Sequence, residues 1–279
     1  MKLKYTYCEK ENKRLIRQLE NGKARYQCIG DGKHVPRMIG FSIWQDAPCF
    51  ADVTRLCRGR PVVITEYSQE ELEQAAYLCM RPVKQVIDIT NSEQAFRYEC
   101  PTRSFFGETR YHHAVQVGTL SACFSGNRNP KEYFFASTTG FAELFVREAA
   151  VEYMRQDQSL HGIVFKPVHM SAGAERLYQM TAERVISQDA IDYPGKKKHC
   201  PVCGKVRYMV DDRYQLNLRL NRENMALDFY ETEAIFGSGF PMPFFLVSKC
   251  LYGLLKKHQL TKGVRFCPVS FLDEGDYVN

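Results

Sequence analysis

Two stretches of this sequence align without a gap: LFVREAAVEYMRQDQSLHGIVFKPV, residues 144–168, and FLVSKCLYGLLKKHQLTKGVRFCPV, residues 245–269. The offset is 101 residues throughout, and six positions are identical, among them Gly162 with Gly263 and Pro167 with Pro268. Many of the other positions pair one apolar residue with another. Agreement over this length indicates an internal repeat.

Each copy of the repeat has the pattern of a helix, a turn and a short strand. In the second copy, basic residues close the helical segment, where cations meet the negative end of the helix dipole. A glycine follows where the chain must leave the helix, and a proline in the alternating segment after it favours an edge strand or the end of the strand. The apolar residues that fall on one helical face are Leu246, Cys250, Leu251, Leu254 and Leu255. We therefore predict an α+β fold with two related helix-turn-strand modules on mixed or antiparallel sheets.

Outside the repeat, periodicity and capping signals predict further elements. Ser68 and Glu71 have the spacing of a capping box, so a helix is expected from Ser68 to Cys79. The other expected elements are helices at Asn12–Leu19 and in the segment Ser171–Asp189, strands at Pro61–Thr65 and Val83–Ile89, and a hairpin or sheet edge at Tyr111–Leu120 followed by the turn-rich segment Gly126–Pro130.

The chain has 279 residues, 44% of them hydrophobic, and a formal net charge of +6. This composition predicts a folded, soluble protein, and we divide it into residues 1–189, with the first repeat copy, and residues 190–279, with the second. No apolar run is long enough for a membrane span, and the N-terminal residues lack the apolar core of a signal peptide. Most of the eleven cysteines are scattered singly and their number is odd, so we predict a reducing, cytoplasmic compartment.

The segment KKKHCPVCGKVRY, residues 196–208, holds the C-x-x-C of the chain. Two thiolates at this spacing, followed by a glycine that permits a tight turn, can face one zinc ion. We therefore predict Cys200 and Cys203 as metal ligands and zinc as a structural cofactor. A metal-free knuckle and a redox dithiol remain as alternatives, and the adjacent His199 is badly placed to reach the same ion.

The segments CPVCG (residues 200–204), DFYETEAIFG (residues 228–237) and the second repeat copy together resemble the C-terminal half of the bacterial double-CXXCG motif family. They also resemble related immunity proteins of polymorphic toxin systems. The resemblance implies a non-catalytic protein that neutralises a cognate toxin by occluding it. The family pattern has two CXXCG motifs, whereas this chain has one. A relic of the second could be Cys100-Pro101, with Arg103 in the place of the missing cysteine, and Cys28 is another candidate ligand.

Our functional prediction is therefore a cytoplasmic immunity protein whose partner is a toxin domain with an acidic or neutral binding face. We expect the contact surface outside the repeat, in the N-terminal 100 residues, without naming its side chains. The alternative is a zinc-knuckle nucleic-acid binder, in which Tyr208 stacks and nearby cations contact phosphates; these cations are Lys196, Lys197, Lys198, Lys205 and Arg207. An enzyme is the least favoured class, because the sequence lacks the nucleophile-elbow, phosphate-loop, dinucleotide and zinc-protease motifs.

Overall fold

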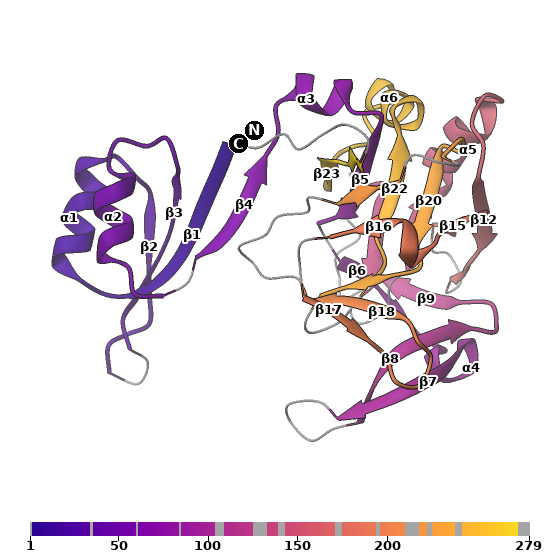
Figure 1. Ribbon diagram of the computed structural model, residues 1–279, viewed down its shortest axis with the longest axis horizontal. Helices are drawn as coiled ribbons and strands as arrows, with labels where there is room; N and C mark the ends of the chain where they lie inside the picture. Colours follow the sequence, from indigo (N-terminus) through magenta and orange to yellow (C-terminus); the bar gives the residue numbers. More distant parts are fainter. Residues whose placement is uncertain are drawn as a thin grey trace. The chain divides into compact units, whose positions relative to one another are not determined.

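The computed structural model of the chain describes twelve segments, which form two compact units (Figure 1). Among the described residues, unit 1 extends to residue 71 and unit 2 begins at residue 72. The boundary predicted between residues 189 and 190 falls inside unit 2. The described segments are residues 2–33, 36–59, 61–83, 85–103, 109–124, 133–138, 143–170, 175–193, 196–209, 218–221, 225–237 and 242–272.

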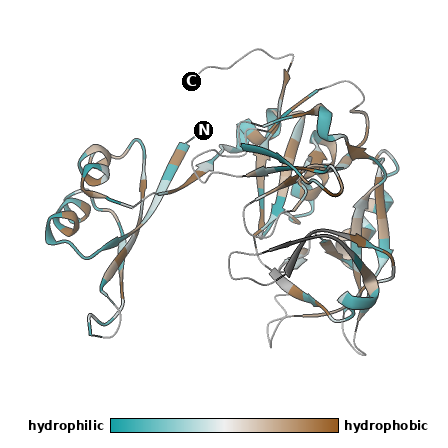
Figure 2. Ribbon diagram, turned by 60° about the horizontal axis from the view of Figure 1, so that its bottom comes forward, coloured by the Kyte–Doolittle hydropathy of each residue, from teal (hydrophilic) through white to brown (hydrophobic). Residues whose placement is uncertain are grey.

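Unit 1 is a four-stranded antiparallel sheet in the order β2-β3-β1-β4 with two helices. Its elements are β1 (Lys2–Lys10), α1 (Lys13–Asn21), β2 (Tyr26–Ile29), β3 (Met38–Trp44), α2 (Phe50–Leu56) and β4 (Val62–Glu66). Alternate residues of β3 are buried and pack against Leu15 and Leu19 of α1, so the unit has a core of its own. In Figure 2 both helices carry teal and brown segments, as expected for helices with one apolar face.

The helix predicted at Asn12–Leu19 is confirmed as α1, whose first turn is capped by the Asn12 side chain accepting from the Arg14 backbone N–H at 2.9 Å. The capping box at Ser68 is also confirmed, since Ser68 and Glu71 exchange hydrogen bonds. The helix that it starts, α3 (Gln69–Gln74), is shorter than predicted. The chain becomes a strand at Tyr77, because this segment is paired on both sides in a sheet of unit 2.

Unit 2 has mixed and antiparallel sheets with short helices, so the predicted α+β class is confirmed. A seven-stranded sheet has the order β12-β14-β11-β10-β6-β9-β13, and a five-stranded sheet has the order β15-β20-β22-β5-β23. Smaller sheets are β16-β19-β24, β17-β18-β21 and the hairpin β7-β8. The bounds are β5 (Tyr77–Pro82), β6 (Gln85–Ile89), α4 (Ser92–Ala95), β7 (Phe96–Arg103), β8 (Thr109–Gln116), β9 (Ser121–Phe124), β10 (Phe135–Thr138), β11 (Leu144–Arg147), α5 (Glu148–Gln156), β12 (Ile163–Pro167), β13 (His169–Met170), β14 (Leu177–Ala182), β15 (Val185–Ile186), η1 (Gln188–Ala190), β16 (Ile191–Asp192), β17 (Lys196–His199), β18 (Val206–Met209), β19 (Arg219–Leu220), β20 (Phe229–Thr232), β21 (Ile235–Phe236), β22 (Phe245–Ser248), α6 (Lys249–Lys257), β23 (Val264–Pro268) and β24 (Ser270–Phe271).

Two parts of unit 2 have the same strand arrangement. We call β12-β14-β11-β10 with α5 the first block and β23-β5-β22-β20 with α6 the second block. In the first block Phe165 lies opposite Met180, and in the second Phe266 lies opposite Met80. β10 pairs in parallel with β6, and its counterpart β20 pairs in parallel with β15. The second block thus takes β5 from a segment that precedes the whole first block in the chain.

Backbone hydrogen bonds outside the strand ladders repeat in the same way. The Val83 N–H donates to the Gly263 carbonyl at 2.8 Å, and the Glu183 N–H donates to the Gly162 carbonyl at 3.0 Å. Gly162 and Gly263 both have positive φ, 84° and 75°, as their place after the helix predicts. β12 and β23 are both edge strands, so the edge predicted from their prolines is confirmed. The origin of the blocks by duplication stays a prediction.

Some predictions inside unit 2 are wrong. Leu246 belongs to β22 rather than to the helix, and Cys250 is exposed, so the apolar face of α6 is narrower than predicted. The helix expected within residues 171–189 is replaced by β14, β15 and a short 3₁₀ turn. Leu177 and Met180 of this segment are buried, but β14 lies between β11 and β12, and this pairing overrides the helical spacing. The segment Gly126–Pro130 lies outside the described residues.

Candidate functional site

The C-x-x-C segment is the tip of the hairpin formed by β17 and β18. The Cys200 N–H donates to the Lys205 carbonyl and the Gly204 N–H donates to the Cys200 carbonyl, each at 2.9 Å. Gly204 has φ +72°, a conformation that this tight turn requires and that glycine adopts without strain. A Cβ at this position would meet no other atom within 4 Å. Cys200 is buried and Cys203 is half-buried, so the turn holds the two predicted ligands at one end of the hairpin.

The hairpin holds the two predicted zinc ligands, Cys200 and Cys203, close to one another in the chain. Among the described residues no group of three or more His, Cys, Asp and Glu side chains is placed to hold a metal. The adjacent His199 is exposed, and Cys28 belongs to β2 of unit 1. Cys200 and Cys203 therefore supply at most half of a tetrahedral zinc shell there, and zinc at this position stays a prediction.

The proposed relic motif Cys100-Pro101-Thr102-Arg103 has a different backbone from the knuckle. It is the end of β7, where Pro101 lies opposite Tyr111 and Arg103 lies opposite Thr109. The side chains at these positions lie outside the described set. Strand pairing with β8 continues through the relic motif, whereas the corresponding residues 200–203 form a turn. Cys100 and Arg103 therefore do not make a second knuckle.

The structure removes two groups from the predicted nucleic-acid surface. Tyr208 is 3% exposed, stacks on Phe236 and donates to the Ile191 carbonyl at 3.1 Å, so its ring is not available to a base. Arg207 donates from Nε to the Gly237 carbonyl at 2.9 Å, and burial lowers its pKa. The remaining cations are Lys196, Lys197 and Lys198, which are exposed on β17, and Lys205, which is half-buried.

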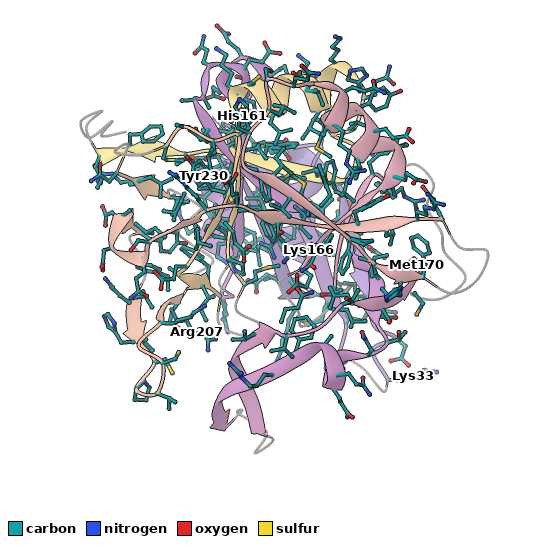
Figure 3. All side chains as sticks on the ribbon, turned by 90° about the vertical axis from the view of Figure 1, so that its right-hand side faces the viewer. Lys33, His161, Lys166, Met170, Arg207 and Tyr230 are labelled. Atoms are coloured by element: carbon teal, nitrogen blue, oxygen red, sulfur yellow. The ribbon has the colours of Figure 1, made fainter. Side chains whose placement is uncertain are left out.

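A second feature of unit 2 is a polar pocket of about 440 Å³ beside β12 and β14. It is lined by the loop of residues 116–120 together with Lys166, Pro167 and Gln179. Lys166 lies directly opposite Gln179 in the ladder, so both side chains are on the same face of the sheet. Lys166, which Figure 3 labels, is exposed.

A chain of side-chain hydrogen bonds leads from this pocket to a half-buried carboxylate. Gln116 Nε2 donates to the Gly118 carbonyl at 3.0 Å, and its Oε1 accepts from Gln179 Nε2 at 2.6 Å. Gln179 Nε2 also donates to the Glu143 carboxylate. Gln179 is 2% exposed, so these partners satisfy an amide that would otherwise be costly to bury.

A second carboxyl, Glu231 on β20, belongs to the same electrostatic group. Burial and, secondly, the charge of Glu143 raise the pKa of Glu231 to about 7, against the opposing effect of Lys205 and Lys166. Burial also raises the pKa of Glu143, although the hydrogen bond from Gln179 and the charge of Lys166 act in the opposite direction. Of these four charged groups only Lys166 lines the pocket, and Glu143 is connected to it through the hydrogen bond from Gln179.

The sequence did not reveal this polar group. Its members come from six different strands and loops, and their types and spacing form no motif. One signal was present in the repeat, where Lys166 aligns with Cys267.

Comparison of this chain with protein-family models, with curated proteins and with solved structures finds no match. None of the helices that the structure describes has the length and apolar character needed to cross a bilayer.

Proposed function

We propose that this protein is a non-catalytic binding protein that neutralises a cognate bacterial toxin by direct binding. The proposal rests on where in the fold the residues that resemble the CXXCG and immunity families lie. Most of the DFYETEAIFG segment and about half of the second repeat copy are core: Phe229, Tyr230, Phe236, Leu246 and Val269 are at most 5% exposed. The resemblance therefore concerns a scaffold, and such a scaffold leaves recognition to surfaces outside it.

Unit 1 supplies a surface of this kind. Five exposed cations lie on α1 and the turn after it, and we call them the basic α1 face: Lys13, Arg14, Arg17, Lys23 and Arg25. Because unit 1 has its own core, these side chains can change without disturbing the packing of unit 2. A concentrated positive surface favours a partner with an acidic face and accelerates its association at low salt.

The predicted zinc has a structural role in this proposal. Bound by Cys200 and Cys203, the ion would hold the turn between β17 and β18, with further ligands from outside the described residues. Metal analysis of the purified protein tests this role, and about one zinc per chain is expected, with the content lost in Cys200→Ser. A content far below one equivalent in the native protein would remove zinc from the proposal. The scattered cysteines support a cytoplasmic location for the same protein.

Co-expression with the toxin domain encoded by the neighbouring gene tests the function. Growth should be rescued, and the two proteins should elute as one complex in size-exclusion chromatography. Arg14→Glu combined with Arg17→Glu should slow association by tenfold or more at low salt, because it reverses the charge of the basic α1 face. Arg184→Glu combined with Lys198→Glu is the matched control, since both residues are exposed in unit 2. Absence of both rescue and complex would sink the proposal.

Nucleic-acid binding through the zinc knuckle is the alternative function. It would show as an affinity that falls steeply with salt and is abolished by reversing the charges of Lys196, Lys197 and Lys198. The burial of Tyr208 and the hydrogen bond of Arg207 weigh against it, since they withdraw the predicted stacking ring and one of the predicted cations.

A further inference from the structure

Unit 1 contains a pocket of about 640 Å³ whose described lining residues all belong to that unit. One wall is the β3 segment of residues 40–44, and another is the turn of residues 22–25, which leads from α1 into β2. Successive residues of a strand point to alternate faces of the sheet, so an uninterrupted run in one wall places the pocket along the edge of β3. We call this pocket the β3 notch.

The edge of β3 that lines the notch carries no paired strand within the described part of the chain. The pairing of β2 with β3 stops at Phe41, whereas β3 continues to Trp44. The Gln45 N–H donates to the Leu3 carbonyl at 2.9 Å, so the odd-numbered residues in this part of β3 make the hydrogen bonds to β1. The N–H and carbonyl of Ser42 therefore point to the side of the notch. A strand edge of this kind is a template for one more strand.

The notch is positively charged. Its described lining contains Lys4, Lys23 and Arg25 and no acidic residue. Lys4 is shared with Glu66, an ion-pair partner at 3.8 Å that is not part of the lining. Lys23 and Arg25 are exposed and belong to the basic α1 face, so the notch continues the surface that we assign to toxin binding. Acidic side chains complement this charge.

Lys23 keeps its side chain at a position where glycine would be easier for the backbone. Its φ is 54°, in the left-handed region that favours glycine directly after a helix. The turn is nevertheless fixed, because the Ala24 N–H donates to the Leu19 carbonyl at 2.8 Å and Gly22 packs against Cys49 with no room for a Cβ. This wall of the notch is therefore formed before a ligand arrives, which lowers the entropic cost of binding.

We propose that the β3 notch receives an extended segment of the toxin, which adds a short strand to the edge of β3 and carries acidic side chains to Lys4, Lys23 and Arg25. The main-chain hydrogen bonds of an added strand supply affinity, and the side chains beside it supply specificity. A nucleic-acid base suits the notch less well, because the Lys4 ammonium already lies over the Trp44 ring, 5.2 Å from its centroid. This mode of binding rests on the proposed function, because the toxin is the partner that it names.

Proline substitutions test the added strand, with the full-length protein and the toxin domain encoded by the neighbouring gene. Ser42→Pro removes the N–H that points to the notch and leaves the hydrogen bonds between β3 and β1 in place. The complex should dissociate tenfold faster or more, as measured by surface plasmon resonance. Val63→Pro is the matched control and should leave dissociation unchanged. Val63 lies on β4, at the opposite edge of the sheet, and by the same alternation its N–H points away from β1.

Glycine substitutions separate the charge of the notch from stability. Lys23→Gly should weaken the complex tenfold or more and at the same time raise the melting temperature of unit 1, since it relieves a positive φ. Gln259→Gly is the matched control, because Gln259 follows α6 with φ 56° and is exposed in unit 2. It should raise the melting temperature of unit 2 and leave toxin affinity unchanged. A variant that binds less and melts later has not lost affinity by unfolding.

Trp44 lines the notch and is the single tryptophan of the chain, so fluorotryptophan labelling reports on this pocket alone. Its fluorine resonance should shift when the toxin domain is added. Absence of any complex would remove the proposed function together with its binding mode. A complex that forms normally with folded Ser42→Pro and Lys23→Gly, or an unchanged fluorine resonance, overturns strand addition alone. Dimerisation of the native protein that Ser42→Pro abolishes would assign the edge to a second copy of this chain and would also overturn it.

Discussion

The two blocks of unit 2 have one backbone and different interiors. In the first block a lysine, a glutamine and a glutamate occupy places that hold two cysteines and a phenylalanine in the second. The starts of the helices differ too: Ser248 caps α6 by accepting from the Leu251 N–H at 3.1 Å, whereas the equivalent Arg147 forms an ion pair with Glu175. Strand order and register therefore depend on the apolar residues that the two blocks share. The remaining positions can be polar in one block and apolar in the other.

The largest effect on stability is expected from substitutions in the apolar core that the two blocks share. Met80 and Met180 are each 1% exposed and belong to one apolar cluster that both blocks contribute to. Met80→Ala and Met180→Ala should each lower the free energy of unfolding by about 3 kcal/mol, because each leaves a cavity. Denaturant unfolding measures the loss. Hydrogen exchange should show weaker amide protection in both blocks for either variant, and a loss confined to one block would mean that the blocks are independent.

The two turn glycines come next. A Cβ at Gly263 would run into the Tyr133 ring, and a Cβ at Gly162 would lie 2.7 Å from Leu227 Cβ. With positive φ in addition, Gly162→Ala and Gly263→Ala should each cost about 2 kcal/mol of stability.

Gly253→Ala is the matched control for these glycines, because Gly253 lies inside α6 with open space around it. This variant should raise stability by about 0.5–1 kcal/mol in the same thermal unfolding assay. Equal effects at Gly253 and Gly263 would show that the turn conformation is not the cause.

The helix caps test a smaller difference between the blocks. Ser248 caps α6 and also donates to Asp228, whose other carboxylate oxygen accepts from the His161 N–H at 2.8 Å. Figure 3 labels His161, whose backbone N–H makes this bond. Ser248→Ala should lower stability by about 1–2 kcal/mol, since it removes a cap and a partner of a buried carboxylate. Ser187→Ala removes the exposed cap of the short 3₁₀ turn. In chemical denaturation it should lower the free energy of unfolding by less than half as much as Ser248→Ala.

Glu231 gives the smallest effect, and it depends on pH. Its pKa rises from 4.5 to about 7 on folding, so between these values the unfolded chain has released a proton that the folded protein keeps. Stability from this group is therefore complete below pH 4.5 and is lost as the pH rises through about 7. Relative to the native protein, Glu231→Gln should be more stable at pH 8 by on the order of 1 kcal/mol and equal to it at pH 4. The exposed Glu183→Gln should show no such difference, and a flat difference for Glu231→Gln would contradict the raised pKa.

Several elements could be predicted because their signals are local. Asn12 and Ser68 start helices through their own side chains, and Gly162 and Gly263 have positive φ in the turns directly before β12 and β23. The segment of β14 could not be predicted in this way. Its apolar spacing suits a helix, and only the partners β11 and β12, which it pairs with on both sides, make it a strand.

The two candidate sites also differ in whether local sequence predicts them. The knuckle at Cys200 and Cys203 was visible in the sequence, because a tight metal-binding turn needs its residues at fixed short spacing. The pocket at Lys166 was not visible, because Gln116, Glu143, Gln179 and Glu231 come from strands and loops that meet only after folding.

By itself, the sequence determined the α+β class, the positions of the two turn glycines, the edge strands and the knuckle, since each depends on neighbouring residues or on a repeat read at constant offset. The tertiary structure decided which strand completes which block, and with it the burial of Tyr208 and the assembly of the polar pocket. Strand pairing joins residues that are far apart in the chain, and no local pattern specifies a partner at that distance.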